Sequence, residues 1–291
     1  MKKRYIKPAR SRNFYVITNT LLSIAVLLAL LAVGLLAAKS AHADEAKSGA
    51  NAAAAENTFI IGAGAAFGPR YSGSSQNMTG PLLLLDYSTS SGFFASTMRG
   101  LGYGSTIGAF NYSAALGYRG GREEKDESDF GFSSGSTRLR GMGTIKGSAS
   151  AILSLGYAPL EWLNLSVTAD LALSQRNNGN AFHFGVSSPF YSGASDKLSL
   201  AATASVGDSK YMQTYYGVTG LQHQNSGYRA FKPKIGLYEV NASLSWEHRF
   251  DAKWALQTMV GATRLQGDAA KSPLASRRLA PNAAIYLTYT Y

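Results

Sequence analysis

The chain ends in the stretch Ala283-Ala284-Ile285-Tyr286-Leu287-Thr288-Tyr289-Thr290-Tyr291, in which apolar and polar side chains alternate. In an extended strand, successive side chains point to opposite faces. One face therefore carries Ala283, Ile285, Leu287, Tyr289 and Tyr291, and the other carries Tyr286, Thr288 and Thr290. This pattern predicts a β-strand with one apolar and one polar face.

The same alternation recurs earlier in the chain. It is clearest in residues 164–174, 198–206 and 240–248, where Leu, Val, Ala and Trp alternate with Ser, Thr, Asn and other polar residues. Strands of soluble sheets are usually about five or six residues long. Transmembrane β-strands need about 9–11 residues, with apolar side chains toward the lipid and polar ones toward the lumen. Strands of this length therefore favour a membrane barrel with a narrow interior.

Aromatic residues agree with this interpretation. Tyr157 and Trp162 flank one short turn, and Phe250 and Trp254 flank another, as in the interfacial girdles of membrane barrels. Apart from residues 21–38, no stretch approaches eighteen apolar residues. A membrane structure without helices must be a closed barrel, because an unpaired sheet edge is not stable in hydrocarbon. The terminal strand ending in an aromatic residue is also similar to the assembly signal of Gram-negative outer-membrane barrels.

The beginning of the chain predicts export. Residues 1–43 hold seven cations and no acidic residue, and they include the apolar run 21–38 followed by Ala41-His42-Ala43. This order is typical of a cleaved secretory signal peptide. An uncleaved anchor helix is the alternative, since eighteen apolar residues could just span a bilayer. We expect cleavage before Asp44, a flexible periplasmic lead-in over residues 44–57 and a barrel over residues 58–291.

Composition excludes several classes of protein. The chain of 291 residues has a formal charge of +11, but removal of the signal peptide leaves 21 cations against 17 anions. So weak and scattered an excess argues against nucleic acid as a partner. The absence of cysteine excludes disulfides, thiolate metal sites and cysteine nucleophiles.

The number of strands is less clear. Ten segments qualify: 58–68, 80–88, 107–119, 144–157, 161–174, 181–190, 196–206, 235–249, 252–264 and 281–291. Barrels of this class have even strand numbers, periplasmic termini, short periplasmic turns and longer outer loops. We therefore expect ten strands, or twelve if residues 207–234 supply one and the Phe93-Phe94-Ala95 region another. Outer loops are expected at 69–79, 120–143, 175–180, 207–234 and 265–280, and periplasmic turns at 158–160, 191–195 and 250–251.

A search for catalytic and metal-binding residues assigns none. His183, His223 and His248 lack partners at metal-ligand spacing. A Ser/His/Asp constellation remains open because such residues meet in space rather than in sequence. Gly62, Gly64 and Gly68 do not match a dinucleotide fingerprint and favour close strand packing instead. The acidic run 123–129 lacks the spacing of a calcium loop. We expect no enzyme, cofactor or metal.

Basic residues gather near the predicted outer loops. Because Arg matches phosphate oxygens bidentately, we expect these residues to pair with lipopolysaccharide. Charge reversal of Arg277 and Arg278 should then reduce the lipopolysaccharide that co-purifies. The cluster consists of Arg119, Arg122, Arg138, Arg140, Arg264, Lys271, Arg277 and Arg278.

Several of these loops resemble the MipA/OmpV family of outer-membrane proteins, in order and over nearly the whole mature chain. The residues that carry the resemblance are Gly68-Pro69-Arg70-Tyr71-Ser72-Gly73-Ser74, Leu139-Arg140-Gly141-Met142-Gly143-Thr144-Ile145, residues 210–218, Ser226-Gly227-Tyr228 and residues 264–273. Two features depart from the family pattern: the basic leader is long, and Tyr291 stands where Phe is common.

The resemblance implies a non-enzymatic scaffold that joins a lytic transglycosylase to a bifunctional penicillin-binding protein during murein growth. The expected partner surface is periplasmic, at 44–57, 89–106, 158–160, 191–195 and 250–251, and is small enough for weak contact only. The alternative is a narrow porin-like channel for small solutes. The family motifs fall in the expected outer loops, where they could close the barrel mouth by Tyr-rich packing.

Overall fold

The computed structural model describes residues 57–126, 128–129 and 133–291. The expected signal peptide, residues 1–43, lies outside the described residues, and so does the expected lead-in, residues 44–57, except for Asn57. Within the described part, no helix is long and apolar enough to cross a membrane.

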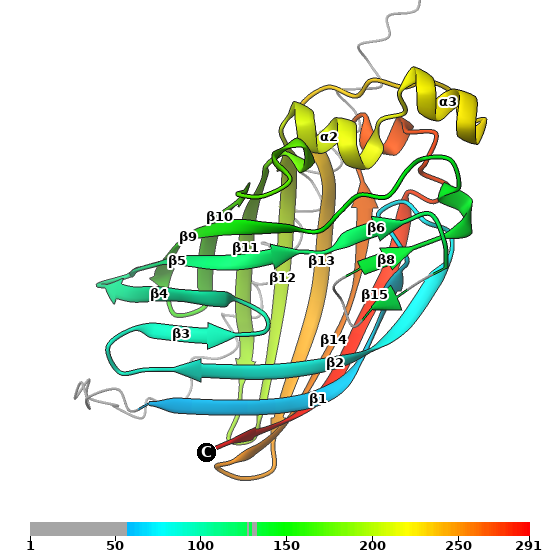
Figure 1. Ribbon diagram of the computed structural model, residues 1–291. Coiled ribbons are helices and arrows are strands. Elements are labelled where there is room, and N and C mark those ends of the chain that lie inside the picture. The colour runs from blue at the N-terminus through cyan, green and yellow to red at the C-terminus, as the bar shows by residue number, and fades with distance from the viewer. Residues whose placement is uncertain (1–56, 127, 130–132) are drawn as a thin grey trace, which may run out of the picture. The chain divides into compact units, whose positions relative to one another are not determined.

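Antiparallel strands form a closed barrel (Figure 1). Each strand pairs with the next along the barrel, and the first strand closes the ring by pairing with the last. The strands are β1 (Thr58–Pro69), β2 (Asn77–Ser88), β3 (Phe93–Ser96), β4 (Gly100–Ile107), β5 (Phe110–Arg119), β9 (Ser148–Leu160), β10 (Leu163–Ala172), β11 (Ala181–Ser192), β12 (Asp196–Gly207), β13 (Gly236–Arg249), β14 (Trp254–Leu265) and β15 (Leu279–Thr290).

The predicted fold class, an antiparallel up-and-down transmembrane barrel, is confirmed, and the strand number is twelve rather than the preferred ten. The two additional strands are β3 and β4, not a strand from residues 207–234. On β4 the luminal positions are Gly100, Gly102, Gly104 and Thr106, so most of the polar half of the alternation carries no side chain. Such a sequence resembles a glycine-rich loop, and this is why the strand was missed.

The predicted alternation sets the two faces of the wall. On β15, Ile285 and Leu287 point outward and are 52% and 40% exposed, while Thr288 is buried toward the lumen. On β13, Ser243 and Ser245 face the lumen, and Leu244 and Trp246 face outward. The barrel is therefore apolar outside, as a lipid-facing surface requires.

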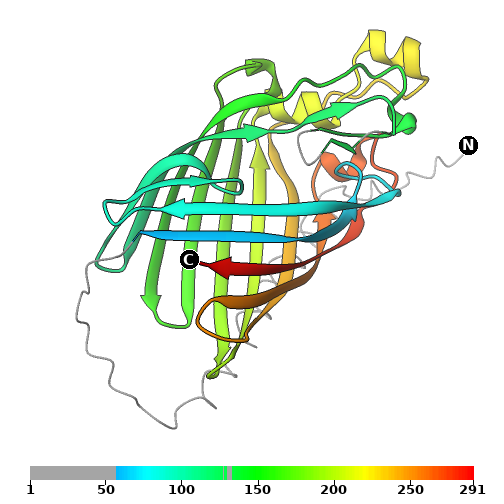
Figure 2. The same ribbon diagram turned by 60° about the horizontal axis from the view of Figure 1, so that its bottom comes forward.

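The two ends of the barrel differ (Figure 2). One end, called the turn end here, carries short connections, the start of β1 and the chain terminus, where the Tyr291 N–H donates to the Phe59 carbonyl. Aromatic pairs surround it: Phe110 stacks on Tyr157, with ring centroids 4.5 Å apart, and Trp254 meets Tyr289 at 4.9 Å. These pairs match the predicted girdle.

The opposite end, called the loop end, carries the long connections. They contain β6 (Gly121–Glu123), β7 (Ser128–Asp129), β8 (Ser133–Gly135), α2 (Ser209–Tyr216), α3 (Gly220–Ser226) and the 3-10 helices η1 (Thr137–Leu139), η2 (Arg176–Asn178) and η3 (Ala269–Lys271). β6, β8 and β7 form a small separate sheet. Asp208 caps α2 by accepting from the Tyr211 N–H, and Thr219 and Gln222 form a capping box on α3.

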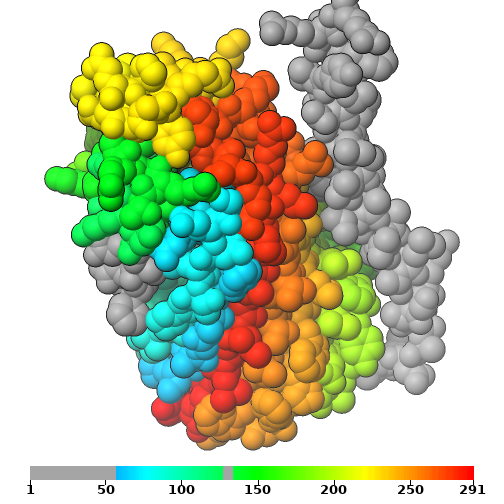
Figure 3. Space-filling view, turned by 90° about the vertical axis from the view of Figure 1, so that its right-hand side faces the viewer, coloured from blue at the N-terminus to red at the C-terminus, as the bar shows by residue number. Residues whose placement is uncertain are grey.

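Two apolar clusters pack between the connections of the loop end, and together we call them the cap. Figure 3 shows these connections, in green, yellow and orange-red, gathered at one end of the molecule. The first is made of Ala181, Met212, Tyr216, Tyr238, Leu265 and Ala269. The second is made of Tyr71, Leu139, Met142, Val218 and Leu274. Each family-like motif except Ser226-Gly227-Tyr228 supplies a buried residue to one of these clusters, and Tyr228 packs against the second. The structure therefore contains the expected Tyr-rich packing of these motifs over the barrel mouth.

Candidate functional site

The shortest seam of the barrel joins β2 to β3. Only three residue pairs connect these strands, whereas twelve connect β1 to β2. β3 and β4 meet in a turn at residues 97–99, which stands level with Leu85, partway along β2. Farther toward the loop end, residues 77–84 of β2 have no strand partner on the side that faces β3, among the described residues.

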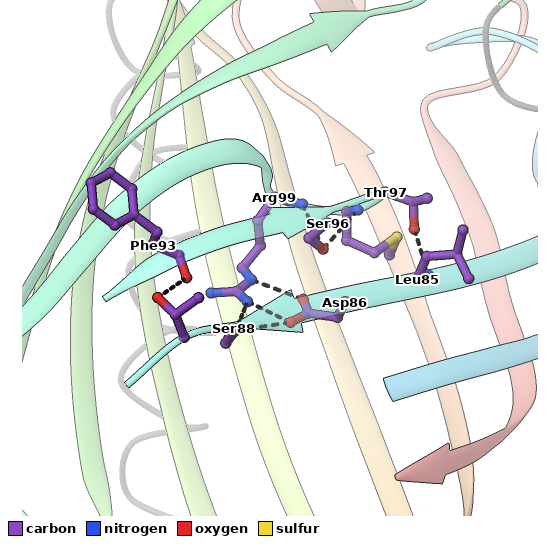
Figure 4. Close-up of polar contacts among 9 residues, drawn as sticks. Leu85, Asp86, Ser88, Phe93, Ser96, Thr97 and Arg99 are labelled. Carbon is purple, nitrogen blue, oxygen red and sulfur yellow. Dashed lines mark hydrogen bonds and ion pairs between the residues drawn. The ribbon is translucent and has the colours of Figure 1, made fainter. Parts of the chain in front are cut away.

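Hydrogen bonds within the wall satisfy the backbone of this turn (Figure 4). The Thr97 N–H donates to the Leu85 carbonyl at 2.9 Å, and the Thr97 hydroxyl accepts from the Leu85 N–H at 3.1 Å. The Ser96 hydroxyl oxygen accepts from the Met98 and Arg99 N–H groups at 3.2 and 3.3 Å. All three N–H groups of the turn are paired, which suits a turn placed in a membrane-spanning wall.

Arg99 links the turn to the luminal face of β2. Its Nη2 lies 2.6 Å from Asp86 Oδ1 and its Nε lies 3.1 Å from Asp86 Oδ2, which makes a bidentate ion pair. Nη2 also donates to the Ser88 hydroxyl at 2.9 Å. The guanidinium lies 4.3 Å from the centroid of the Phe94 ring, within the range of a cation–π contact.

These residues border a cavity of about 560 Å³ on the luminal side of the wall. Its lining combines aromatic and aliphatic surface with hydroxyl, amide and guanidinium groups, a combination that suits a small ligand. Asp86 is connected to the cavity through its ion pair with Arg99. The cavity lining includes Ser88, Phe94, Met98, Arg99, Asn111 and Ser154.

Sequence reasoning missed this site. Residues 89–106 were expected to form a periplasmic surface for partners, but β3 and most of β4 lie within this range and belong to the wall. Turn-end surface is left at 89–92, 108–109, 161–162, 193–195 and 250–253. The expected turn at 158–160 falls inside β9, and the first two residues of the expected turn at 191–195 fall inside β11. The outward Leu101 and Tyr103, alternating with glycine, were the signal that could have revealed β4.

The basic residues expected to bind lipopolysaccharide divide into two groups. The first points inward: Arg119 forms an ion pair with Asp170 at 2.9 Å, and Arg122 is 6% exposed and donates to the Tyr215 carbonyl at 2.8 Å. Burial lowers the pKa of Arg122. For these two the expectation is wrong, because they are occupied within the protein.

The second group lies nearer the surface. Arg140, Arg264, Lys271 and Arg278 are exposed, and Lys271 pairs with Asp268 at 3.0 Å. Arg138 donates to Ser75 and Ser276, and Arg277 donates to Asn77, so both help to hold loops together.

The histidines lie apart from one another. His183 faces the lumen, 3.0 Å from the Ser205 hydroxyl, but Ser205 is 3% exposed and cannot reach a substrate. His223 in α3 contacts the Tyr228 carbonyl at 2.7 Å. His248, near the turn end as expected, lies 2.8 Å from Asp196. No group of three or more potential metal ligands occurs within residues 57–126 and 133–291.

Carboxylates of the acidic run accept hydrogen bonds from neighbouring loop residues. The Glu123 carboxylate accepts from the Thr144 hydroxyl at 2.7 Å, and Asp126 accepts from the Thr137 N–H at 3.0 Å. The hydrogen bond from the Thr137 backbone lowers the pKa of Asp126. These carboxylates are thus committed to loop contacts.

The chain matches one family model and is similar to several solved structures. The model of the family described as MltA-interacting protein MipA matches residues 61–291. A search of curated proteins gives no significant match. Among solved structures, the chain is similar to the NanC porin at 8% identity, with 79% of this chain and 98% of that chain covered and a TM-score of 0.45. It is also similar to the COG4313 outer membrane channel from Pseudomonas putida F1, at 10% identity, 85% and 100% coverage and a TM-score of 0.41.

Proposed function

The chain belongs to the MipA family of MltA-interacting proteins, and on that premise we propose that it is a non-enzymatic outer-membrane scaffold for murein enzymes. The partners proposed are a lytic transglycosylase and a bifunctional penicillin-binding protein. The observation that carries the proposal is the family match, which spans all but the first three residues of the barrel. The match indicates no family of enzymes.

The orientation follows from the two ends. Barrels of the outer membrane place short turns and chain termini in the periplasm, so the turn end faces the murein layer. Export requires the signal peptide proposed for residues 1–43. Because the turns are short, the partner surface is small, and contacts there are weak or transient.

The packing of the loop end supports the scaffold over a pore. The cap buries Tyr216, Met212 and Leu139 to 1% exposure each, so it packs as a core rather than as a mobile loop. The luminal cavity of about 560 Å³ is the observation that favours the alternative of a narrow channel. Conductance across a planar bilayer separates the two: the scaffold gives no steady ion-selective steps, and a channel gives them.

The scaffold itself is tested by capture of purified partners in detergent. Glu161→Arg and Ala194→Arg place charge on two exposed turns of the turn end. Both should reduce capture of the transglycosylase and of the penicillin-binding protein. Leu221→Arg, on exposed α3 at the loop end, is the matched control and should leave capture unchanged. Equal capture by all three variants and the unmodified chain would reject a turn-end partner surface, and no capture by any would reject the scaffold.

A further inference from the structure

The free edge of β2 carries a proline, which disfavours pairing with another strand. Leu85 turns its N–H and carbonyl groups toward the 97–99 turn, and the Leu83 carbonyl accepts from the Thr97 hydroxyl at 3.1 Å. Because alternate residues of a strand direct these groups to the same side, the nitrogen of Pro81 also faces that side. Proline has no N–H, and within sheets it is confined mainly to unpaired edges. At Pro81 the edge therefore has no N–H group that lipid would leave unsatisfied.

The luminal face of β2 changes character along the strand. Met78, Leu82 and Leu84 face the lumen near the free edge, followed by Asp86 and Ser88 beside the cavity. On β13, by contrast, the luminal face carries polar residues such as Ser243 and Ser245. The apolar stretch therefore leads from the free edge to the Arg99 group.

The side chains that oppose this stretch are small. Gly64 pairs with Leu82, and Gly62 pairs with Leu84, with both glycines on the luminal face of β1. A Cβ at either position would lie 3.0 Å or less from backbone of β15. Leu82 and Leu84 consequently have no large neighbour on β1, and they present apolar surface to the lumen.

We propose that the gap between residues 77–84 of β2 and the 97–99 turn is a lateral opening for amphipathic single-chain molecules. The apolar chain of such a molecule lies along Met78, Leu82 and Leu84. Its polar head binds in the cavity beside Arg99, Ser88 and Asn111. Entry from the membrane suits a barrel whose loop-end connections are packed together by the cap and whose outward residues at the gap, Leu83 and Leu85, are apolar and exposed. This inference is independent of the scaffold function.

Binding is tested with dansyl-labelled undecanoate and the full-length mature protein in detergent. Fluorescence should rise saturably with probe concentration. Leu82→Ala should weaken binding about tenfold, because the shorter side chain loses apolar contact with the bound probe. The neighbouring Leu83→Ala points outward and should bind as the unmodified protein does. Heat-modified gel mobility verifies that both variants fold.

The route is tested separately, using the absence of native cysteine. Met98→Cys places one thiol on the turn, where Met98 is 63% exposed, and a bulky maleimide on it should slow probe association about tenfold. Val260→Cys, on the outer face of β14 at 56% exposure, carries the same label as the control.

Each result decides the proposal. Saturable binding that is weakened by Leu82→Ala but not by Leu83→Ala, with slowing only at the labelled Met98→Cys, supports it. Absence of saturable binding, or equal effects of the two leucine variants, overturns the site. Equal association rates for the two labelled variants overturn the lateral route and assign entry to the turn end.

Discussion

Gly64 of β1 lies opposite Tyr286 of β15, so close that a Cβ on the glycine would be 2.0 Å from the Ile285 carbonyl oxygen and 2.5 Å from the Tyr286 Cα. No real Cβ atom approaches backbone so closely. The contact lies in the β1–β15 pairing that closes the barrel. The small residue predicted to allow close strand packing is therefore required where the first and last strands meet.

Gly64→Ala should consequently destabilise the barrel by about 1–3 kcal/mol, because backbone must shift to admit the methyl group. The measurement is the temperature at which the folded form loses its fast gel mobility. Gly80→Ala is the control, since Gly80 is also luminal, on the neighbouring strand, and nothing lies within 4 Å of an added Cβ. Equal melting of the two variants would contradict the close approach.

We expect Tyr216 to stabilise the cap through packing more than through its hydroxyl. It is 1% exposed and its hydroxyl lies 2.8 Å from the Ser72 hydroxyl. Tyr216→Ala should cost about 3–5 kcal/mol, as truncation of a buried aromatic residue does, whereas Tyr216→Phe should cost about 1 kcal/mol. Denaturant unfolding of the cap, followed by protease cleavage at residues 217–235, measures both. Similar losses from the two variants would assign the stability to the hydrogen bond.

The cap should weaken in alkali. Burial raises the pKa of Tyr211 and of Tyr216 well above the ordinary 10.0. Their folded pKa values exceed the unfolded one, so the stability they contribute is complete below pH 10 and is lost as the pH rises beyond it. Tyrosinate absorbance should show these two groups ionising only together with cap unfolding. In Tyr211→Phe/Tyr216→Phe the decline in stability above pH 10 should be shallower, and an unchanged slope would refute the assignment.

Lipopolysaccharide binding should depend on the exposed cations of the loop end only. Arg264→Glu/Arg278→Glu should lower the lipopolysaccharide that co-purifies per protein, because both side chains are exposed at that end. Lys253→Glu, at the turn end, provides the comparison and should not change it. A ratio that stays constant in the double variant would show that lipid phosphates do not contact this pair.

The sequence determined a great deal without tertiary information. Alternation in residues 283–291 and 240–248 depends only on the two-residue period of a strand, so it sets the outward and luminal faces directly. Strands can cross the hydrocarbon core only as a closed ring. The alternation of apolar and polar residues therefore also predicted a membrane barrel. The loops and most strand boundaries followed from where the alternation stopped.

Pairing between strands decided the rest. Gly100, Gly102 and Gly104 leave most of the luminal face of β4 without side chains, so its neighbours are needed to show that it is a strand. Arg119 and Arg122 look like surface cations in the sequence, yet Asp170 and the Tyr215 carbonyl, both distant along the chain, draw them inside. Arg99 and Asp86 likewise meet only because the short β3 folds back beside β2. A sequence pattern reports the direction of a side chain from its own strand, and only the packed chain decides what that side chain meets.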